Sequence, residues 1–313
     1  MTPRLTPPPA PDLPGLSRSL VKIRAVVPED AFTATVLGTQ RNGNGIVIGA
    51  DGLILTIGYL ITEATDVWLT THNGRELPGH ALAYDQVTGF GLVLPLGSVG
   101  VSPLEFGASS ELAAGSEAHV VSHAQMAPPM SVNVLSRREF AGAWEYLLED
   151  AIFTTPAHSH WSGAALIDHH GLLVGVGSLL VREILGATET DANMFVPTDL
   201  LKPLLDDLRT RGGVRRPPRP WLGVYASETK GTVVVAGVIE GGPAQLADIR
   251  EGDLIREVAD REVTTLAEFY RQLWTQGPAG TIVTLTTTRD GKPARIKVRS
   301  VDRMDLLKRP RAN

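Results

Sequence analysis

The sequence predicts a mostly β protein of two domains, a closed β-barrel or sandwich followed by a small α+β module. Its 313 residues are enough for two domains. From Ser19 to about Leu185, short apolar runs alternate with glycine-containing turns, which is typical of many short β-strands. From Trp221 to Val301, strand-like runs accompany one amphipathic helix pattern, as in a compact α+β unit.

The composition excludes several classes of function. Hydrophobic residues make up 43% of the chain and charged residues 20%, an ordinary globular balance. With 29 Lys and Arg against 34 Asp and Glu, the net charge is −5, so neither nucleic acid nor a membrane is expected as a partner. The absence of cysteine excludes disulfides, a cysteine nucleophile and thiolate metal sites.

Residues 1–18 are expected to form an extended, mobile arm, because they are rich in proline, with consecutive prolines at 7–9. The next apolar stretch, Leu20 to Val27, is interrupted by charged residues. It therefore cannot serve as a secretory signal or a membrane span. With Met1 as the native start, the expected location is the cytoplasm.

The first domain is expected to span residues 19–210. Asn73-Gly74 predicts a β-hairpin, because both residues tolerate positive φ. A helix is predicted from Asp199 to Arg209, with Thr198 as its N-cap and leucines at intervals of three and four residues. The expected strands lie around residues 45–49, 53–56, 67–70, 92–94, 118–121, 132–135, 164–167 and 172–176.

The second domain is expected to span residues 221–302, after a linker at 211–220 rich in proline and arginine. A solvated linker is favoured there, and binding of an acidic partner is the alternative. Thr265 and Glu268 predict a capping box ahead of a helix, and Asp290-Gly291 a hairpin turn. Strands are expected around residues 232–236, 254–258, 282–288 and 294–299, and a charged tail at 303–313.

Four segments of the second domain resemble a PDZ domain of the HtrA type. They are Trp221-Leu-Gly-Val224, Gly241-Gly-Pro-Ala244, Ile249-Arg-Glu-Gly-Asp-Leu-Ile255 and Val263 to Leu273. The resemblance implies that an extended peptide adds as a strand, and that backbone N–H groups of the first segment capture its terminal carboxylate.

The residues of that first segment suit this role. Gly223 has no side chain, so a carboxylate can approach the backbone amides closely. Leu222 and Val224 would line an apolar pocket for the last side chain of the peptide. The alternative is that Trp221 to Val224 is only a packed strand.

The first domain resembles the HtrA/Deg protease domain from about Ser19 to Leu208, which implies a trypsin-like double β-barrel. The matching stretches are Gly43 to Thr56, Asp66 to Asp85 and Asn193 to Pro197 with the following helix. The resemblance also locates the catalytic positions. The resemblance implies that Tyr59, in Thr56-Ile-Gly-Tyr-Leu-Ile61, occupies the position of the base histidine. Gly89, in Thr88-Gly-Phe-Gly-Leu-Val93, occupies the position of the aspartate that orients this histidine. Ser162, in His160-Trp-Ser-Gly-Ala164, occupies the position of the nucleophile.

These exchanges predict the loss of proteolysis by the family mechanism. A serine hydroxyl is a weak nucleophile without a base, and tyrosine, with a pKa of about 10, is protonated near neutral pH. Losing only the orienting carboxylate costs on the order of 10⁴ in turnover in another serine protease. His160 replaces a glycine two residues before the serine, and its Cβ restricts the backbone that forms the oxyanion hole.

A rewired serine hydrolase and a metal site are the alternatives for chemistry at this position. A rewired serine hydrolase would need another base, yet His158 and His160 are poorly placed within the same loop. The remaining histidines fall on expected strands, turns and loops: His72, His80, His119, His123, His169 and His170. A metal site could join His158 and His160 to an oxygen of Glu149, Asp150 or Asp168, but loop histidines without metal are favoured. Trp161 either fills the emptied cleft beside Tyr59 or lies on the surface, and a repurposed small-ligand site is a further alternative.

The sequence therefore predicts an inactive HtrA-like protein that binds peptides or protein C-termini as an adaptor or regulator, as in protein quality control. The alternative is an active serine endopeptidase that uses Ser162 with a base foreign to the family. No cofactor is expected. Many relatives form trimers through the N-terminal part of the protease domain, where Phe32 would contribute, so a homo-oligomer is left open.

Overall fold

The computed structural model describes residues 10–185 and 188–308, which divide into two compact units. Within this range the first unit comprises residues 10–138 and 150–214, and the second comprises 139–149 and 215–308. Residues 139–149, which we call the hairpin tip, therefore group with the second unit although they lie within the first domain in sequence.

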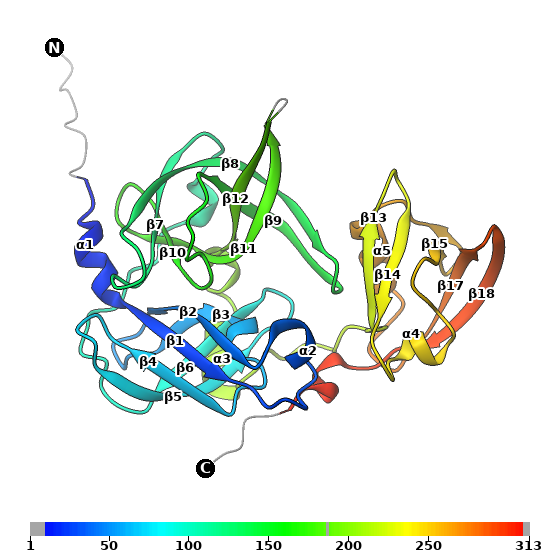
Figure 1. Ribbon diagram of the computed structural model, residues 1–313, viewed down its shortest axis with the longest axis horizontal. Coiled ribbons are helices and arrows are strands. Elements are labelled where there is room, and N and C mark those ends of the chain that lie inside the picture. Colours follow the sequence, from blue (N-terminus) through cyan, green and yellow to red (C-terminus); the bar gives the residue numbers. More distant parts are fainter. Residues whose placement is uncertain (1–9, 186–187, 309–313) are drawn as a thin grey trace. The chain divides into compact units, whose positions relative to one another are not determined.

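Six antiparallel strands of the first unit close into a barrel in the order β1-β2-β3-β6-β5-β4 (Figure 1). Their inward side chains form its core, where Ile23, Ile46, Leu55 and Leu92 have no exposed surface. A short helix, α2 (Ala34–Leu37), lies between the first two strands. The strands are β1 (Leu20–Val26), β2 (Gln40–Val47), β3 (Ile54–Ile57), β4 (Asp66–Thr70), β5 (Glu76–Tyr84) and β6 (Phe90–Pro95).

A second closed barrel follows in the order β10-β11-β12-β9-β8-β7 (Figure 1). Its core contains Val120, Ile152, Leu166 and Phe195. The two barrels confirm the predicted double β-barrel. The strands are β7 (Glu117–Val121), β8 (Met130–Gly142), β9 (Tyr146–Thr155), β10 (Ala165–Ile167), β11 (Leu173–Leu185) and β12 (Thr188–Pro197).

The predicted helix from Asp199 to Arg209 is wrong in its first half. Thr198–Leu200 forms a 3-10 turn, and the α-helix α3 covers only Leu205–Arg211. Pro203 explains the difference, because it lacks an N–H donor and its ring clashes with the carbonyl four residues earlier. Thr198 is not the side-chain cap either, since its hydroxyl donates to the Leu173 carbonyl at 3.2 Å.

The second unit is a mostly antiparallel sheet with one substantial helix, α5 (Leu266–Trp274). The helix begins at the predicted capping box, in which Thr265 Oγ1 accepts from Glu268 N at 3.1 Å. Asp290 and Gly291 both adopt positive φ in the predicted turn. The other elements are β13 (Val224–Glu228), β14 (Val233–Val238), α4 (Pro243–Leu246), β15 (Leu254–Val258), β16 (Arg261–Glu262), β17 (Ile282–Arg289) and β18 (Lys292–Arg299).

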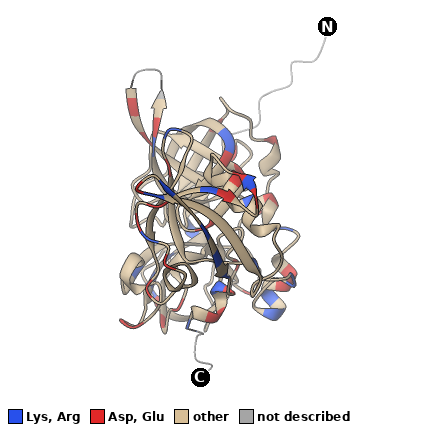
Figure 2. Ribbon diagram, turned by 90° about the vertical axis from the view of Figure 1, so that its right-hand side faces the viewer, with Lys and Arg blue, Asp and Glu red and all other residues tan. Residues whose placement is uncertain are grey.

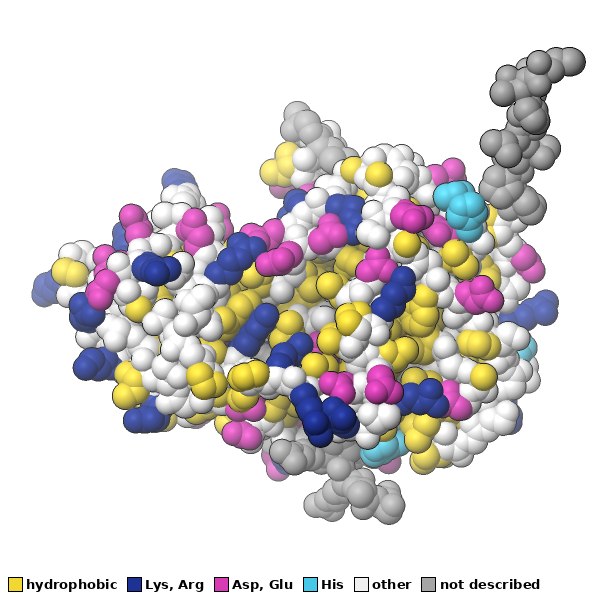
Figure 3. Space-filling view, turned by 180° about the vertical axis from the view of Figure 1, so that it is seen from behind, with side chains coloured by type: hydrophobic (Ala, Val, Ile, Leu, Met, Phe, Trp, Pro, Cys, Tyr) yellow, Lys and Arg dark blue, Asp and Glu magenta, His cyan; other side chains and the backbone are white. Residues whose placement is uncertain are grey.

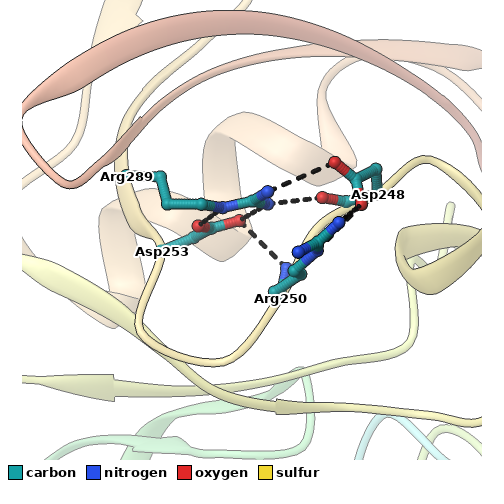
Figure 4. Close-up of polar contacts among 4 residues, drawn as sticks. All are labelled: Asp248, Arg250, Asp253 and Arg289. Atoms are coloured by element: carbon teal, nitrogen blue, oxygen red, sulfur yellow. Dashed lines mark hydrogen bonds and ion pairs between the residues drawn. The ribbon is translucent and has the colours of Figure 1, made fainter.

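A buried carboxylate fixes the loop before β15 (Figure 4). The Asp253 side chain is 1% exposed and accepts from Arg289 Nε at 2.6 Å and from the Arg250 amide at 2.9 Å. Arg289 also contacts Asp248 at 3.2 Å, and Asp248 pairs with Arg250 at 2.6 Å. The hydrogen bonds from Arg289 hold the pKa of Asp253 below its ordinary value.

The predicted arm and linker are more ordered than expected where the structure describes them. Residues 1–9 of the arm lie outside the described range, but Leu13–Leu16 forms a helical turn, α1, whose cap Asp12 accepts from Gly15 N at 3.0 Å. In the linker, the Arg219 guanidinium lies 3.8 Å from the centre of the Trp274 ring, so this end is packed rather than solvated.

Two further expectations are adjusted in detail. The hairpin at Asn73-Gly74 exists, but of this pair only Gly74 has a positive φ. In the predicted charged tail, Arg303–Leu306 forms a 3-10 turn capped by Asp302, while residues 309–313 are outside the described range.

Charges of both signs are interspersed on the surface. Figure 2 shows basic and acidic residues scattered along the ribbon, and Figure 3 shows hydrophobic side chains at the surface among the charged ones. No helix within residues 10–185 and 188–308 has the length and apolar character required to span a bilayer.

Candidate functional site

Tyr59 and Ser162, 103 residues apart in sequence, meet in the first unit. Tyr59 lies in the 3-10 turn Gly58–Leu60 that follows β3, and Ser162 lies in the turn between β9 and β10. The Tyr59 Oη atom is 2.8 Å from Ser162 Oγ. The structure therefore brings together two of the three residues that the family resemblance placed at catalytic positions.

The hydroxyl of Tyr59 is held by a second contact. Its Oη atom is also 2.8 Å from the carbonyl oxygen of Ser178 in β11. A carbonyl oxygen only accepts, and a phenol carries one proton. Both contacts are satisfied when Tyr59 donates to Ser178 and Ser162 donates to Tyr59.

The state of the Tyr59 hydroxyl decides what this pair can do chemically. Burial among protein atoms raises the pKa of Tyr59 to about 12, against the smaller opposing effects of hydrogen bonds with Ser162 and Trp161. At neutral pH only about one molecule in 10⁵ would carry the phenolate form. A neutral phenol is a poor acceptor for the serine proton.

Gly89 lies in the turn before β6, on backbone that suits glycine. Its φ is 85°, in the region that side-chain-bearing residues rarely adopt. Its carbonyl accepts from Gly58 N at 2.7 Å, which links it to the turn that carries Tyr59. An aspartate at this position would be strained as the backbone stands.

The backbone around Ser162 does not present the pair of free amides that an oxyanion hole needs. The amide of His160, two residues before the serine, donates to His158 Nδ1 at 3.1 Å. His158 is 3% exposed, and its Nε2 atom lies 3.4 Å from the Pro128 carbonyl. Burial lowers the pKa of His158, which fits a neutral ring that accepts at Nδ1 and donates at Nε2.

Asn44 in β2 holds the serine loop in place, and sequence analysis did not identify it. Its side-chain Nδ2 donates to the carbonyls of His160 at 2.9 Å and Ser162 at 3.1 Å. Its Oδ1 accepts from the His123 amide at 2.9 Å, and its own amide donates to the Ser162 carbonyl at 2.8 Å. Asn44 has no exposed surface, so this fully used amide positions the loop from inside the protein.

The other candidate histidines do not supply a base to Ser162. His160 Nδ1 lies 3.0 Å from Ser159 Oγ, and His119 Nδ1 lies 3.1 Å from Ser131 Oγ. The ring of His123 is buried, which lowers its pKa. His169 and His170 lie in the expected turn, where the amide of His170 donates to Asp168.

A metal centre finds no support in the described residues. Across 10–185 and 188–308, no three or more His, Asp or Glu side chains are grouped so that they could hold a metal ion. Trp161 is half-buried and interacts with Tyr59.

A second candidate site lies at the start of the second unit, where Trp221, Leu222, Gly223 and Val224 precede and begin β13. Gly223 has a φ of 79°, and a Cβ there would lie 3.0 Å from the Trp221 ring. Leu222 and Val224 are buried in the core of this unit. This conformation turns three successive amides toward one point.

The group at that point is Glu145, which the sequence analysis missed. Its Oε1 atom accepts from the amides of Leu222 at 3.1 Å, Gly223 at 2.9 Å and Val224 at 3.2 Å. Glu145 lies in the hairpin tip and is 4% exposed. No motif marks it, because the contact joins segments 77 to 79 residues apart.

Each of the two units matches a known protein family. Residues 43–176 match the trypsin-like peptidase domain family, and residues 220–299 match the PDZ domain family. The chain is 27% identical over 285 residues to the serine protease PepD of Mycobacterium tuberculosis, which covers 82% of this chain and 60% of PepD. The chain therefore contains a trypsin-like peptidase domain followed by one PDZ domain, and it is similar to serine proteases of the HtrA type.

A second curated relative has a similar level of identity to this chain. The periplasmic pH-dependent serine endoprotease DegQ of Escherichia coli is 23% identical over 275 residues, covering 82% of this chain and 58% of DegQ. The chain thus spans less than two thirds of these curated relatives.

Solved structures share the fold. The HtrA-type protease AlgW with decapeptide has a TM-score of 0.55 at 18% identity, over 96% of this chain and 98% of that one. The serine endoprotease from Yersinia pestis has a TM-score of 0.54 at 18% identity, over 93% and 96%.

Proposed function

We propose that this HtrA-like chain binds peptides or protein C-termini without cleaving them, as an adaptor or regulator. The observation that carries the proposal is the 2.8 Å contact between Tyr59 Oη and Ser162 Oγ. A protonated phenol beside the serine hydroxyl is a poor acceptor for its proton, which supports the absence of cleavage. Gly89, which has no carboxylate, and His160, whose amide is bonded to His158, support the same conclusion.

The binding half of the proposal is supported by the second unit. The amides of Leu222, Gly223 and Val224 already coordinate one carboxyl oxygen, which is the chemistry that captures a peptide C-terminus. The HtrA-type protease AlgW, which shares this fold, was solved with a decapeptide. A cytoplasmic location and a homo-oligomeric state stay predictions.

Cleavage of casein and of unfolded peptides by the purified protein tests the proposal, with Ser162→Ala as the matched control and an active family member as the positive control. We expect no cleavage by either variant, together with binding of C-terminal peptides that Gly223→Glu abolishes. A thermal melt of Gly223→Glu checks that this variant is folded. Cleavage that disappears in Ser162→Ala would instead establish an active serine endopeptidase and overturn the proposal.

A further inference from the structure

The carboxylate-binding amides of the second unit are engaged by the chain itself. The Oε1 atom of Glu145 accepts all three of them, and its Oε2 atom lies 3.3 Å from the Leu222 amide. Both partners lie within the second unit, to which the hairpin tip belongs. A side-chain carboxyl thus occupies the position that a terminal carboxylate would take.

The backbone beside Glu145 makes a hydrogen bond to β13, the strand at the edge of the sheet. The carbonyl of Ala143 accepts from the amide of Ala226 in β13 at 2.9 Å. Glu145 is two residues after Ala143 and contacts Val224, which is two residues before Ala226. The hairpin tip and β13 therefore run in opposite directions at these two contacts. A peptide that adds to a sheet edge as an antiparallel strand has the same direction.

An apolar side chain and helix α5 complete the contact. Leu147 is 7% exposed and belongs to the same core cluster as Leu222, Val224 and Phe269. On the helix, Tyr270 Oη donates to the Gly142 carbonyl at 2.7 Å. The hairpin tip therefore provides three features of a peptide ligand: a carboxyl, a backbone hydrogen bond to β13 and a buried apolar anchor.

The turn that presents Glu145 holds this residue in the left-handed region of φ, where a glycine would be less strained. Residues 143–145 connect β8 to β9, and Glu145 has a φ of 58°. Glycine is favoured at the left-handed position of such a loop, and another residue there costs about 1 kcal/mol. Strain of this kind persists where surrounding contacts over-determine it, and the hydrogen bonds to the carboxyl are among those contacts.

We propose that the peptide groove of the second unit holds the hairpin tip as an internal ligand, with the Glu145 side chain in place of a terminal carboxylate, so that a free C-terminus binds only by displacing it. The inference rests on the proposed function, because it identifies the occupant of the same groove. A free peptide and the hairpin tip then compete for one set of amides, and the apparent affinity for the peptide is reduced by the fraction of occupied grooves.

The test removes the internal carboxyl from the full chain. Glu145→Gly deletes it and relieves the positive φ, Glu145→Gln keeps the side-chain length, and Glu149→Gln is the control. Glu149 is in the same hairpin, but its side chain is 80% exposed and 3.6 Å from Arg271. Two quantities are measured: hydrogen exchange of the amides of residues 222–224 without peptide, and binding of labelled decapeptides with free C-terminal Val, Leu, Phe or Ala.

We expect Glu145→Gly to lose exchange protection at residues 222–224 and to bind its preferred peptide at least tenfold more tightly than the original chain, while Glu149→Gln matches the original. Glu145→Gln, which keeps one accepting oxygen, should retain most of the exchange protection. Unchanged protection and unchanged affinity in Glu145→Gly would overturn the inference. Lost protection without peptide binding by any variant would leave the internal contact established and refute the proposed function instead.

Discussion

The contact between Glu145 and the amides of the second unit should make peptide binding depend on pH. Burial raises the pKa of Glu145 to about 7, and this effect exceeds the opposing effects of the three amides and of the nearby Arg303 charge. Tyr270, the other titratable group at this contact, has its own pKa raised by burial and stays neutral. A carboxyl with a raised pKa when bound takes up a proton on binding, so docking of the hairpin tip is favoured at low pH and weakens as pH rises toward 7.

The size of the effect follows from the two pKa values. Glutamate in solvent has a reference pKa of 4.5, against about 7 in the groove. For a single group with these values, docking weakens about 70-fold between pH 5 and pH 8, which corresponds to about 2.5 kcal/mol. The terminal carboxylate of a free peptide, with a pKa of about 3.5, stays ionised across this range.

Fluorescence anisotropy with a labelled C-terminal peptide measures this change. The original chain should bind the peptide tens of times more tightly at pH 8 than at pH 5. Glu145→Gln, which cannot ionise, should show little pH dependence, and Glu149→Gln should follow the original chain. Affinity that is flat in the original chain, or that strengthens toward pH 5, would refute this account of Glu145.

Three further predictions concern stability. Tyr59→Phe should cost about 1 kcal/mol, because it removes the hydroxyl that contacts Ser162 and Ser178, and thermal unfolding that is unchanged would contradict that network. Asn44→Ala should lower the free energy of unfolding in urea by about 2–4 kcal/mol, because several buried backbone groups lose their partner. A decrease of less than about 1 kcal/mol would show that the hydrogen bonds of Asn44 are not needed to hold the serine loop. Asp253→Asn should destabilise the second unit by about 2 kcal/mol, because it weakens the buried contacts with Arg289 and the Arg250 amide. The chemical-shift changes that it causes should stay within residues 215–308. Unfolding confined to the first unit would contradict this role of Asp253.

Much of the fold was predictable because it depends on local signals. Short apolar runs ended by glycine turns identified the barrel strands, and Thr265 with Glu268 identified the start of α5. The leucine spacing predicts a start of α3 that is too early, because Pro203 lacks an N–H donor and its ring clashes with the preceding turn. The α-helix therefore begins only at Leu205.

The candidate site was predictable only in part. Tyr59 and Ser162 were placed by motif, and the structure brings their hydroxyls together. Asn44 and Glu145 act through contacts with residues distant in sequence, and neither belongs to a periodic pattern or a motif. Such contacts depend on how the strands pair, which one sequence does not specify residue by residue.

The measurement that tests the central claim most directly is labelling of Ser162 by a fluorophosphonate probe, read by intact mass with Ser162→Ala and an active family member alongside. The probe reacts with a serine whose proton a neighbouring base can take. With Tyr59 protonated beside it, Ser162 should stay unlabelled while the active relative is modified. Labelling of the original chain that disappears in Ser162→Ala would contradict the account and show that Ser162 has a working base.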